Sequence, residues 1–137
     1  MSLDENSSRE EVLVYIENFP YDFLTNFSGN TWAQPYIDEA AKMSVREEPF
    51  SFLCYFSENP WAQPYIDEAI KTSIAFSPFY FLDYFFEKPW AQPYIDEVLI
   101  KEAAKEKPEF FLKNWSNRFP QGIDTALFAL GGKNVAE

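Results

Sequence analysis

The chain has 137 residues, of which 47% are hydrophobic, so it is of single-domain size and too apolar to be disordered over most of its length. It carries 22 acidic and 11 basic residues and no histidine, which gives a net charge of −11. Because nucleic-acid binding relies on Lys and Arg at phosphates, this balance argues against nucleic acid and favours basic partners. No stretch approaches the roughly 20 apolar residues of a membrane span, so no membrane insertion is expected.

The N-terminal segment lacks the basic start and apolar middle of a signal peptide, so a cytoplasmic location is the default expectation. We expect residues 1–8 to be disordered or derived from an expression tag, and residues 132–137 to form a tail. The single cysteine, Cys54, rules out an internal disulfide. It lies between Phe, Leu and Tyr residues, which favours a small buried thiol.

The most informative feature is the seven-residue sequence Ala-Gln-Pro-Tyr-Ile-Asp-Glu, which occurs three times, each time after a tryptophan. With that tryptophan the copies span residues 32–39, 61–68 and 90–97, a step of 29 residues. A fixed period of roughly 20–50 residues is typical of stacked units that bury an apolar face against their neighbours. The sequence therefore predicts a repeat architecture.

A second signature, Pro-x-x-Phe-Leu-x-x-(Phe/Trp), begins at Pro20, Pro49, Pro78 and Pro108. Apolar residues three, four and seven places after a proline form one stripe along a helix. Proline suits the first helical position, because its missing N–H has no helical partner there. The pattern predicts a short helix at each of these four sites.

A longer helix is predicted after each tryptophan, starting near Pro35, Pro64 and Pro93 and ending before the next proline-led helix. The corner that contains the tryptophan is expected to be a tight turn. The predicted core positions are Ile37, Ala40, Ala41, Ser44 and Val45 in the first copy, Ile66, Ala69, Ile70, Ser73 and Ile74 in the second, and Ile95, Val98, Leu99 and Ala103 in the third, with Glu102 at the serine position.

These elements define a single helical-repeat domain over residues 9–131. It consists of a capping helix at 9–18, repeats at 20–48, 49–77 and 78–107, and a degenerate C-terminal capping repeat at 108–131. Ser8 and Glu11 are spaced to form a capping box at the first helix. The atypical ends suit a complete small array, and a piece of a longer array is the alternative.

The arrangement resembles the α-solenoid repeats of the tetratricopeptide and HEAT type in architecture. The period of 29 differs from theirs, and the tetratricopeptide Trp-Leu-Gly-Tyr spacing is missing. The repeat pattern predicts an all-α, right-handed α-solenoid of about nine helices over residues 9–131. The resemblance implies a scaffold that binds a protein or a peptide, without identifying the partner.

Catalysis has little support in the sequence. Without histidine, histidine-based triads and imidazole metal sites are impossible, and no glycine-rich phosphate loop is present. The remaining acid pairs, at 38–39, 67–68 and 96–97, lie on different helices about 8–10 Å apart, too far for one metal ion to bridge two rows. We expect no catalytic residue, no metal and no cofactor. Ion pairs four residues apart give these acids a structural role instead: Asp38–Lys42, Asp67–Lys71 and Glu97–Lys101.

Two interpretations stay open for the Trp and Tyr of the corners: they plug the junctions between repeats, or they line a groove for an extended peptide. The Gln and the acid pair are identical in all copies although partial exposure is expected, whereas exposed positions of the proline-led helices vary. This difference indicates a constraint beyond the single unit, either a Gln bonded to the backbone of the next repeat or a shared ligand surface.

Aromatic residues on the proline-led helices are a second candidate surface, and these rings are either partner surface or core. Taken together, the candidate partner-binding residues are Trp32, Gln34, Tyr36, Asp38, Trp61, Gln63, Tyr65, Asp67, Trp90, Gln92, Tyr94, Asp96, Phe50, Phe79, Tyr80 and Tyr84.

The sequence thus favours a non-catalytic scaffold that binds a protein or peptide of basic or mixed charge. The alternative is a structural module that self-associates through its aromatic surface. A third possibility, a carboxylate-only hydrolase, would need two acids about 5–10 Å apart in a cleft.

Overall fold

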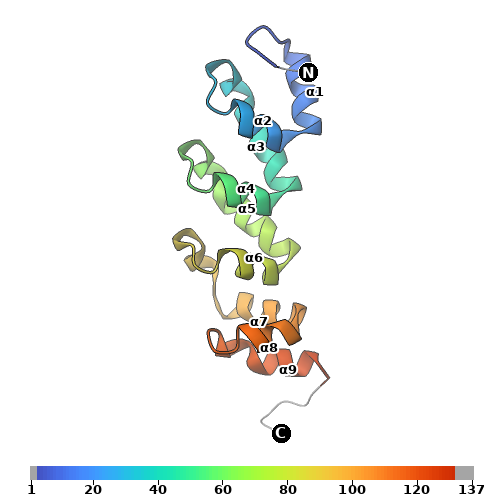
Figure 1. Ribbon diagram of the computed structural model, residues 1–137, viewed down its shortest axis with the longest axis vertical. Helices are drawn as coiled ribbons and strands as arrows, with labels where there is room; N and C mark the ends of the chain where they lie inside the picture. The colour runs from blue at the N-terminus through green and yellow to red at the C-terminus, as the bar shows by residue number, and fades with distance from the viewer. Residues whose placement is uncertain (1–2, 132–137) are drawn as a thin grey trace. The chain divides into compact units, whose positions relative to one another are not determined.

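The structure, a computed structural model, describes residues 3–131. Throughout this range the regular elements are α-helices and short 3-10 segments, and no strand occurs in it (Figure 1). The all-α prediction is therefore confirmed. The chain divides into two compact units, Met1–Thr72 and Ser73–Glu137. None of the helices in residues 3–131 has both the length and the apolar character needed to cross a bilayer.

The first unit holds, in chain order, α1 (Arg9–Asn18), α2 (Pro20–Phe27), η1 (Thr31–Ala33), α3 (Gln34–Glu47), α4 (Pro49–Phe56), η2 (Pro60–Ala62) and α5 (Gln63–Phe76), which runs on past residue 72. The second unit continues with α6 (Pro78–Phe85), η3 (Pro89–Tyr94), α7 (Glu97–Glu106), α8 (Pro108–Asn114), η4 (Pro120–Gly122) and α9 (Ile123–Ala129). Within each unit, helices that follow one another pack together, as α2 does with α3 and α6 with α7.

Proline begins α2, α4, α6 and α8, as predicted. The residue before each proline is not helical, with φ −140° and ψ 61° at Phe19 and φ −139° and ψ 60° at Glu48. The proline ring disfavours the α conformation of the residue before it, so the preceding helix ends there. A single residue therefore connects each longer helix to the next proline-led helix.

The first helix starts with the predicted capping box. The Glu11 backbone N–H donates to the Ser8 hydroxyl at 3.1 Å, and the Ser8 N–H donates to the Glu11 carboxylate at 2.9 Å. The Ser8 backbone N–H, and next the Ser8 hydroxyl, lower the pKa of the Glu11 carboxyl below its usual value. Leu3, within the segment expected to be disordered, is only 4% exposed and contributes a side chain to the core.

The corners of the first two copies are 3-10 segments that lead directly into α3 and α5. Each of these helices begins at the glutamine, Gln34 or Gln63, one residue before the expected proline. Proline at the second helical position loses no hydrogen bond, because the first four N–H groups of a helix lack an intrahelical acceptor.

The third copy has one additional residue, with 30 instead of 29 between successive prolines, and the structure places it at the corner. There η3 extends to Tyr94, Ile95 leaves the helical region with φ −91° and ψ 85°, and α7 starts only at Glu97. Asp96 caps this late start, since its carboxylate accepts the Leu99 N–H at 2.9 Å.

This insertion changes the core register of α7. Val98, predicted to be buried, is 69% exposed, whereas Ile100 and Ala104 are buried. The prediction for the third copy is confirmed at Leu99 and Ala103 and wrong at Val98, because the register follows the next proline and not the preceding tryptophan. Counted back from that proline, positions 9, 8, 5 and 4 are buried in both helices: Ala40, Ala41, Ser44 and Val45 in α3, and Leu99, Ile100, Ala103 and Ala104 in α7. Ala103, not Glu102, therefore stands at the serine position.

Aromatic rings form the centre of both cores. Phe23 and Phe52 in the first unit and Phe111 in the second are each 0% exposed. Trp115 joins the second core at a position where the earlier copies have phenylalanine, and it meets the Phe86 ring at 4.7 Å in an edge-to-face contact. Such contacts contribute about 0.5–1.5 kcal/mol beyond the area that they bury.

Gly122, at the start of α9, lies against the second core and provides a test of its packing. A Cβ built on Gly122 would overlap Cζ of Phe111 and lie 3.1 Å from Cβ of Ala104. We expect Gly122→Ala to lower the free energy of unfolding by about 1–3 kcal/mol, because both neighbours are buried and cannot easily move. Urea denaturation measures this change. Gly29→Ala is the control, since nothing lies within 4 Å of its Cβ, and an equal loss in both variants would contradict the packing explanation.

The Ser44 hydroxyl is buried and has no hydrogen-bond partner among the described residues. Ala103 fills the equivalent place in α7 without a polar atom. We expect Ser44→Ala to leave the free energy of unfolding unchanged or to raise it by up to about 1 kcal/mol, and Ala103→Ser to lower it by about 1–2 kcal/mol. Chemical denaturation of both variants checks this pair. A clear loss of stability in Ser44→Ala would show that the hydroxyl contributes a bond after all.

Candidate functional site

The three repeat tryptophans are half-buried at the corners and pack against the preceding helix. The Trp61 ring lies 6.0 Å from Phe52 and 5.2 Å from Phe56, measured between ring centroids. Trp32 and Trp90 contact the equivalent rings of their own copies. The tryptophans therefore contribute to the packing of the corner in their own copy, and both interpretations, a plug between repeats and a peptide groove, stay predictions.

The glutamine of each copy is bonded to the backbone of its own corner. Nε2 of Gln63 donates to the Ser57 carbonyl oxygen at 2.9 Å and to the Asn59 carbonyl oxygen at 3.0 Å. Gln34 and Gln92 donate in the same way to the carbonyls six and four residues before them. The amide thus donates to the Ser57 carbonyl, and it shares the Asn59 carbonyl with the Ala62 N–H, which donates to it at 3.0 Å within the 3-10 corner. These bonds within one repeat copy explain why the glutamine is the same in all three copies. Neither a bond to the next repeat nor a shared ligand surface is needed to explain it.

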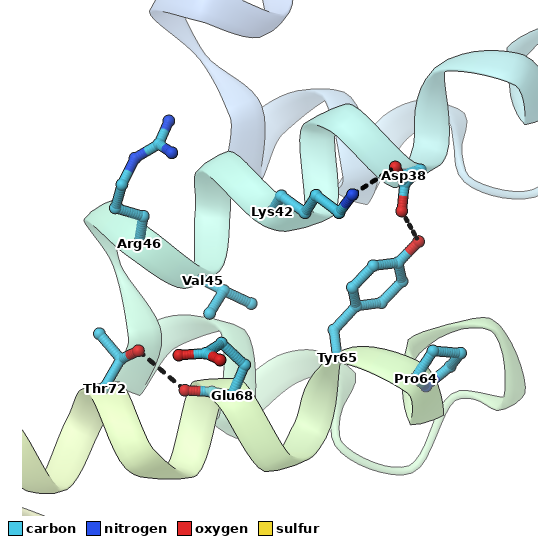
Figure 2. Close-up of a pocket in the computed structure, with 8 residues that line it drawn as sticks. All are labelled: Asp38, Lys42, Val45, Arg46, Pro64, Tyr65, Glu68 and Thr72. Carbon is cyan, nitrogen blue, oxygen red and sulfur yellow. Dashed lines mark hydrogen bonds and ion pairs between the residues drawn. The ribbon is translucent and has the colours of Figure 1, made fainter.

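Tyr65 and Asp38 form a hydrogen bond between successive copies. The Tyr65 hydroxyl on α5 donates to Oδ1 of Asp38 on α3 at 2.8 Å, and Nζ of Lys42 lies 3.0 Å from Oδ2 (Figure 2). Lys42 and then Tyr65 lower the pKa of Asp38 below its ordinary value. Partial burial, and then the bond to Asp38, raises the pKa of Tyr65 to about 12. Asp38 is therefore a fixed anion, and Tyr65 stays neutral at ordinary pH.

The ion pairs predicted four residues apart are present. Besides the pair at Asp38, Lys71 lies 3.0 Å from Asp67 and Lys101 lies 3.1 Å from Glu97. All of these side chains are well exposed, so each pair contributes little to stability. The acid of the third copy, Asp96, has a different role as the N-cap of α7.

Asp38 and Tyr65 line a groove of about 640 Å³ between α3 and α5 (Figure 2). Val45, Pro64 and the ring of Tyr65 supply its apolar surface. Charged side chains stand around them, as Figure 2 shows for Lys42 and Arg46 along α3. The complete lining is Asp38, Lys42, Val45 and Arg46 from α3, and Pro64, Tyr65, Glu68 and Thr72 from α5.

Two charged groups of this groove keep unused bonding capacity. Arg46 forms no ion pair with any residue that the structure describes, and the Glu68 carboxylate accepts no hydrogen bond within residues 3–131. A guanidinium offers five N–H donors, and a carboxylate accepts through two oxygens. A ligand that carries both an anionic and a cationic group can bind here without breaking an existing pair.

The second unit contains a related groove of about 1010 Å³ between α7 and α9. The sequence has no tyrosine after Tyr94, so the bridge to an aspartate is not repeated there. An acid, a lysine and a second base nonetheless recur 11, 7 and 3 residues before the next proline, as Asp38, Lys42 and Arg46 in α3 and as Glu97, Lys101 and Lys105 in α7.

The aromatic candidates on the proline-led helices divide into core and surface. Phe79 is 2% exposed and belongs to the second core, and Phe50 is half-buried. Tyr80 and Tyr84 are 41% and 56% exposed, and their rings stack 6.1 Å apart on α6. Cys54, expected to be buried, is exposed because it lies outside the apolar stripe of α4.

Of the predicted partner-binding residues, the groove between α3 and α5 brings together only Asp38 and Tyr65. Tyr36 and Tyr94 are half-buried, and the tryptophans and glutamines serve the corners. Sequence analysis missed the groove because its two walls belong to different copies, whereas periodicity describes one helix at a time. The groove residues not singled out as partner-binding are Lys42, Val45, Arg46, Pro64, Glu68 and Thr72.

Tyr65→Phe removes the hydroxyl of the bridge and keeps the ring. We expect it to lower the free energy of unfolding by about 1 kcal/mol or less at neutral pH, because the bond is partly open to solvent. The pKa of the Tyr65 hydroxyl rises from 10.0 to about 12 on folding, so its contribution is complete below pH 10 and is lost as the pH rises towards 12. The difference in the free energy of unfolding between wild type and variant should therefore decrease as the pH rises from 10 towards 12. Urea denaturation at neutral and alkaline pH measures it, and a difference that is independent of pH would contradict the bridge.

None of the protein-family models, curated proteins or solved structures compared with the chain matches it. These comparisons therefore provide no evidence about the chain beyond its internal repetition. That repetition consists of the same glutamine bonds at three corners and the same buried positions in α3 and α7.

Proposed function

We propose that the chain is a non-catalytic repeat scaffold that binds an extended peptide in the groove between α3 and α5. In this proposal the 29-residue helical hairpins stack as a right-handed α-solenoid. The equivalent glutamine bonds at three corners support a regular stack, because they give successive hairpins similar corners. The single-residue connections before each proline support it for the same reason.

The observation that carries the proposal is one groove that combines apolar surface with two charged side chains, Arg46 and Glu68, that form no ion pair within 4 Å among the described residues. Ligand sites are mostly apolar, with a few polar groups that fix the orientation of the ligand. Val45, Pro64 and the Tyr65 ring can contact an apolar side chain of the peptide. Arg46 and Glu68 can pair with an acidic and a basic side chain on either side of it. The expected partner is therefore a peptide of mixed charge.

The bridge between Tyr65 and Asp38 prepares this groove before any ligand arrives. It joins α3 to α5, so it restricts the separation of the two walls. Binding to a surface that is already ordered loses less conformational entropy, and the affinity rises accordingly. The bridge therefore favours binding even though its own atoms are already paired.

The ionisation of the groove favours binding over hydrolysis. A carboxyl group that acts as general acid needs a raised pKa, whereas Lys42 and Tyr65 lower the pKa of Asp38. The chain contains no histidine that could act as a base. The groove is thus better suited to hold a peptide than to cleave a bond.

Selection from a phage-displayed library of random peptides, with the whole chain as bait, tests the proposal. Enriched peptides should carry an acidic and a basic residue on either side of an apolar one. Arg46→Glu should raise the Kd of the best peptide at least about tenfold, because it replaces the unpaired cation by an anion. Fluorescence anisotropy with the labelled peptide measures the Kd.

Lys113→Glu is the matched control, since it makes the same charge change on α8, outside the groove. Its Kd should equal that of the wild type. Arg46 is exposed, so the variant should fold, which circular dichroism verifies. Failure to enrich any peptide, or an equal loss of affinity in both variants, would overturn the proposal.

A further inference from the structure

The first helix carries an open apolar groove of about 410 Å³ on its outer side. Its apolar lining is Val14, Tyr15 and Phe19, and Val14 and Phe19 are 52% and 54% exposed. The charged residues that line it, Glu10 and Glu11, are both acidic. Exposed apolar surface of this kind usually marks an interaction site.

The size of two side chains on α1 limits what can bind in this groove. In α3 the residues 9 and 5 places before the next proline are Ala40 and Ser44, both small and 0% exposed. In α1 these places hold Glu11 and Tyr15. Their larger side chains keep another helix face at a distance, whereas a single protruding side chain can lie beside Val14 and against the Tyr15 and Phe19 rings, which contact each other at 5.6 Å.

The last described helix offers such a side chain. Phe128 on α9 is 71% exposed, and Lys101 and Lys105 of α7 line the same groove as Phe128. The ion pairs of these lysines with Glu97 and Glu102 are exposed, so the lysines can exchange partners with little loss of stability. An aromatic ring is thus presented beside two lysines, in a groove whose lining also contains Glu97 and Asp124.

We propose that copies of this chain associate head to tail, with the Phe128 ring of one copy in the α1 groove of the next. The apolar contact would provide the affinity. Lys101 and Lys105 of the first copy would lie near Glu10 and Glu11 of the second, which complements the charge of the groove. This inference does not depend on peptide binding between α3 and α5.

The distribution of charge favours this pairing over a symmetric one. Residues 1–72 carry 13 acidic and 4 basic side chains, whereas residues 73–137 carry 9 and 7. Two α1 grooves face to face would bring the glutamates of both copies together, and like charges at an interface oppose association. A contact between different surfaces leaves one free groove and one free ring, so it continues as an open chain or closes as a ring.

Sedimentation velocity of the whole chain, over roughly 1–200 µM, tests the association. The average sedimentation coefficient should rise with concentration. Val14→Asp and Phe128→Asp should each weaken the association at least about tenfold, because each places a charge in the apolar contact. Val98→Asp and Phe76→Asp are matched controls, since these residues are 69% and 65% exposed and line neither groove.

A mixing experiment separates association between the Phe128 surface and the α1 groove from every arrangement in which like surfaces pair. Val14→Asp leaves the Phe128 surface intact, and Phe128→Asp leaves the α1 groove intact. Each variant alone should be monomeric, and an equimolar mixture should form a 1:1 complex that does not grow further. A wild-type chain that stays monomeric over the whole range, controls that dissociate as the test variants do, or a mixture without a complex would each overturn the inference.

Discussion

The fold depends on a conformational constraint that four prolines impose on the residues before them. Each of these residues is held outside the helical region, so one helix ends and the next begins at a defined place. The core follows from this point, because buried side chains lie at the same distances before the proline in α3 and in α7. The extra residue of the third copy is absorbed at the corner, where the break at Ile95 and the cap by Asp96 leave the proline-based register intact.

Identity between the repeat copies has several physical causes, and ligand binding is not required for most of them. The tryptophan packs on the preceding helix and the glutamine bonds its own corner. Tyr65 and Asp38 meet across two successive copies. A position at which the repeat copies differ is more informative for function than the identical positions. Three residues before the next proline, the copies have Arg46, Ala75 and Lys105, so only two of the three longer helices place a cation there.

The two proposed surfaces differ in how they would select a partner. The groove between α3 and α5 combines opposite charges with apolar surface, and the hydrogen bond from Tyr65 to Asp38 joins its two walls. It therefore suits a foreign peptide that carries both charges. The groove on α1 is apolar with acidic groups alone, which suits an aromatic ring accompanied by lysines. A net charge of −11 makes two chains repel each other at long range. Contact between two chains therefore depends on the local match of apolar surface and opposite charge.

Local constraints made much of this structure readable from the sequence. The helical class, the proline-led starts, the capping box at Ser8 and the exposed ion pairs all depend on residues within about one or two turns of each other, so spacing alone predicts them. The tertiary structure decided which side chains from different copies meet. Whether Val98 or Ile100 is buried, whether a ring such as Phe79 or Tyr80 faces the core, and which residues share a groove with Tyr65 depend on how two helices pack. Periodicity within one helix contains no information about the side chains of the other, and for that reason only the folded chain brought Arg46 and Glu68 into one site.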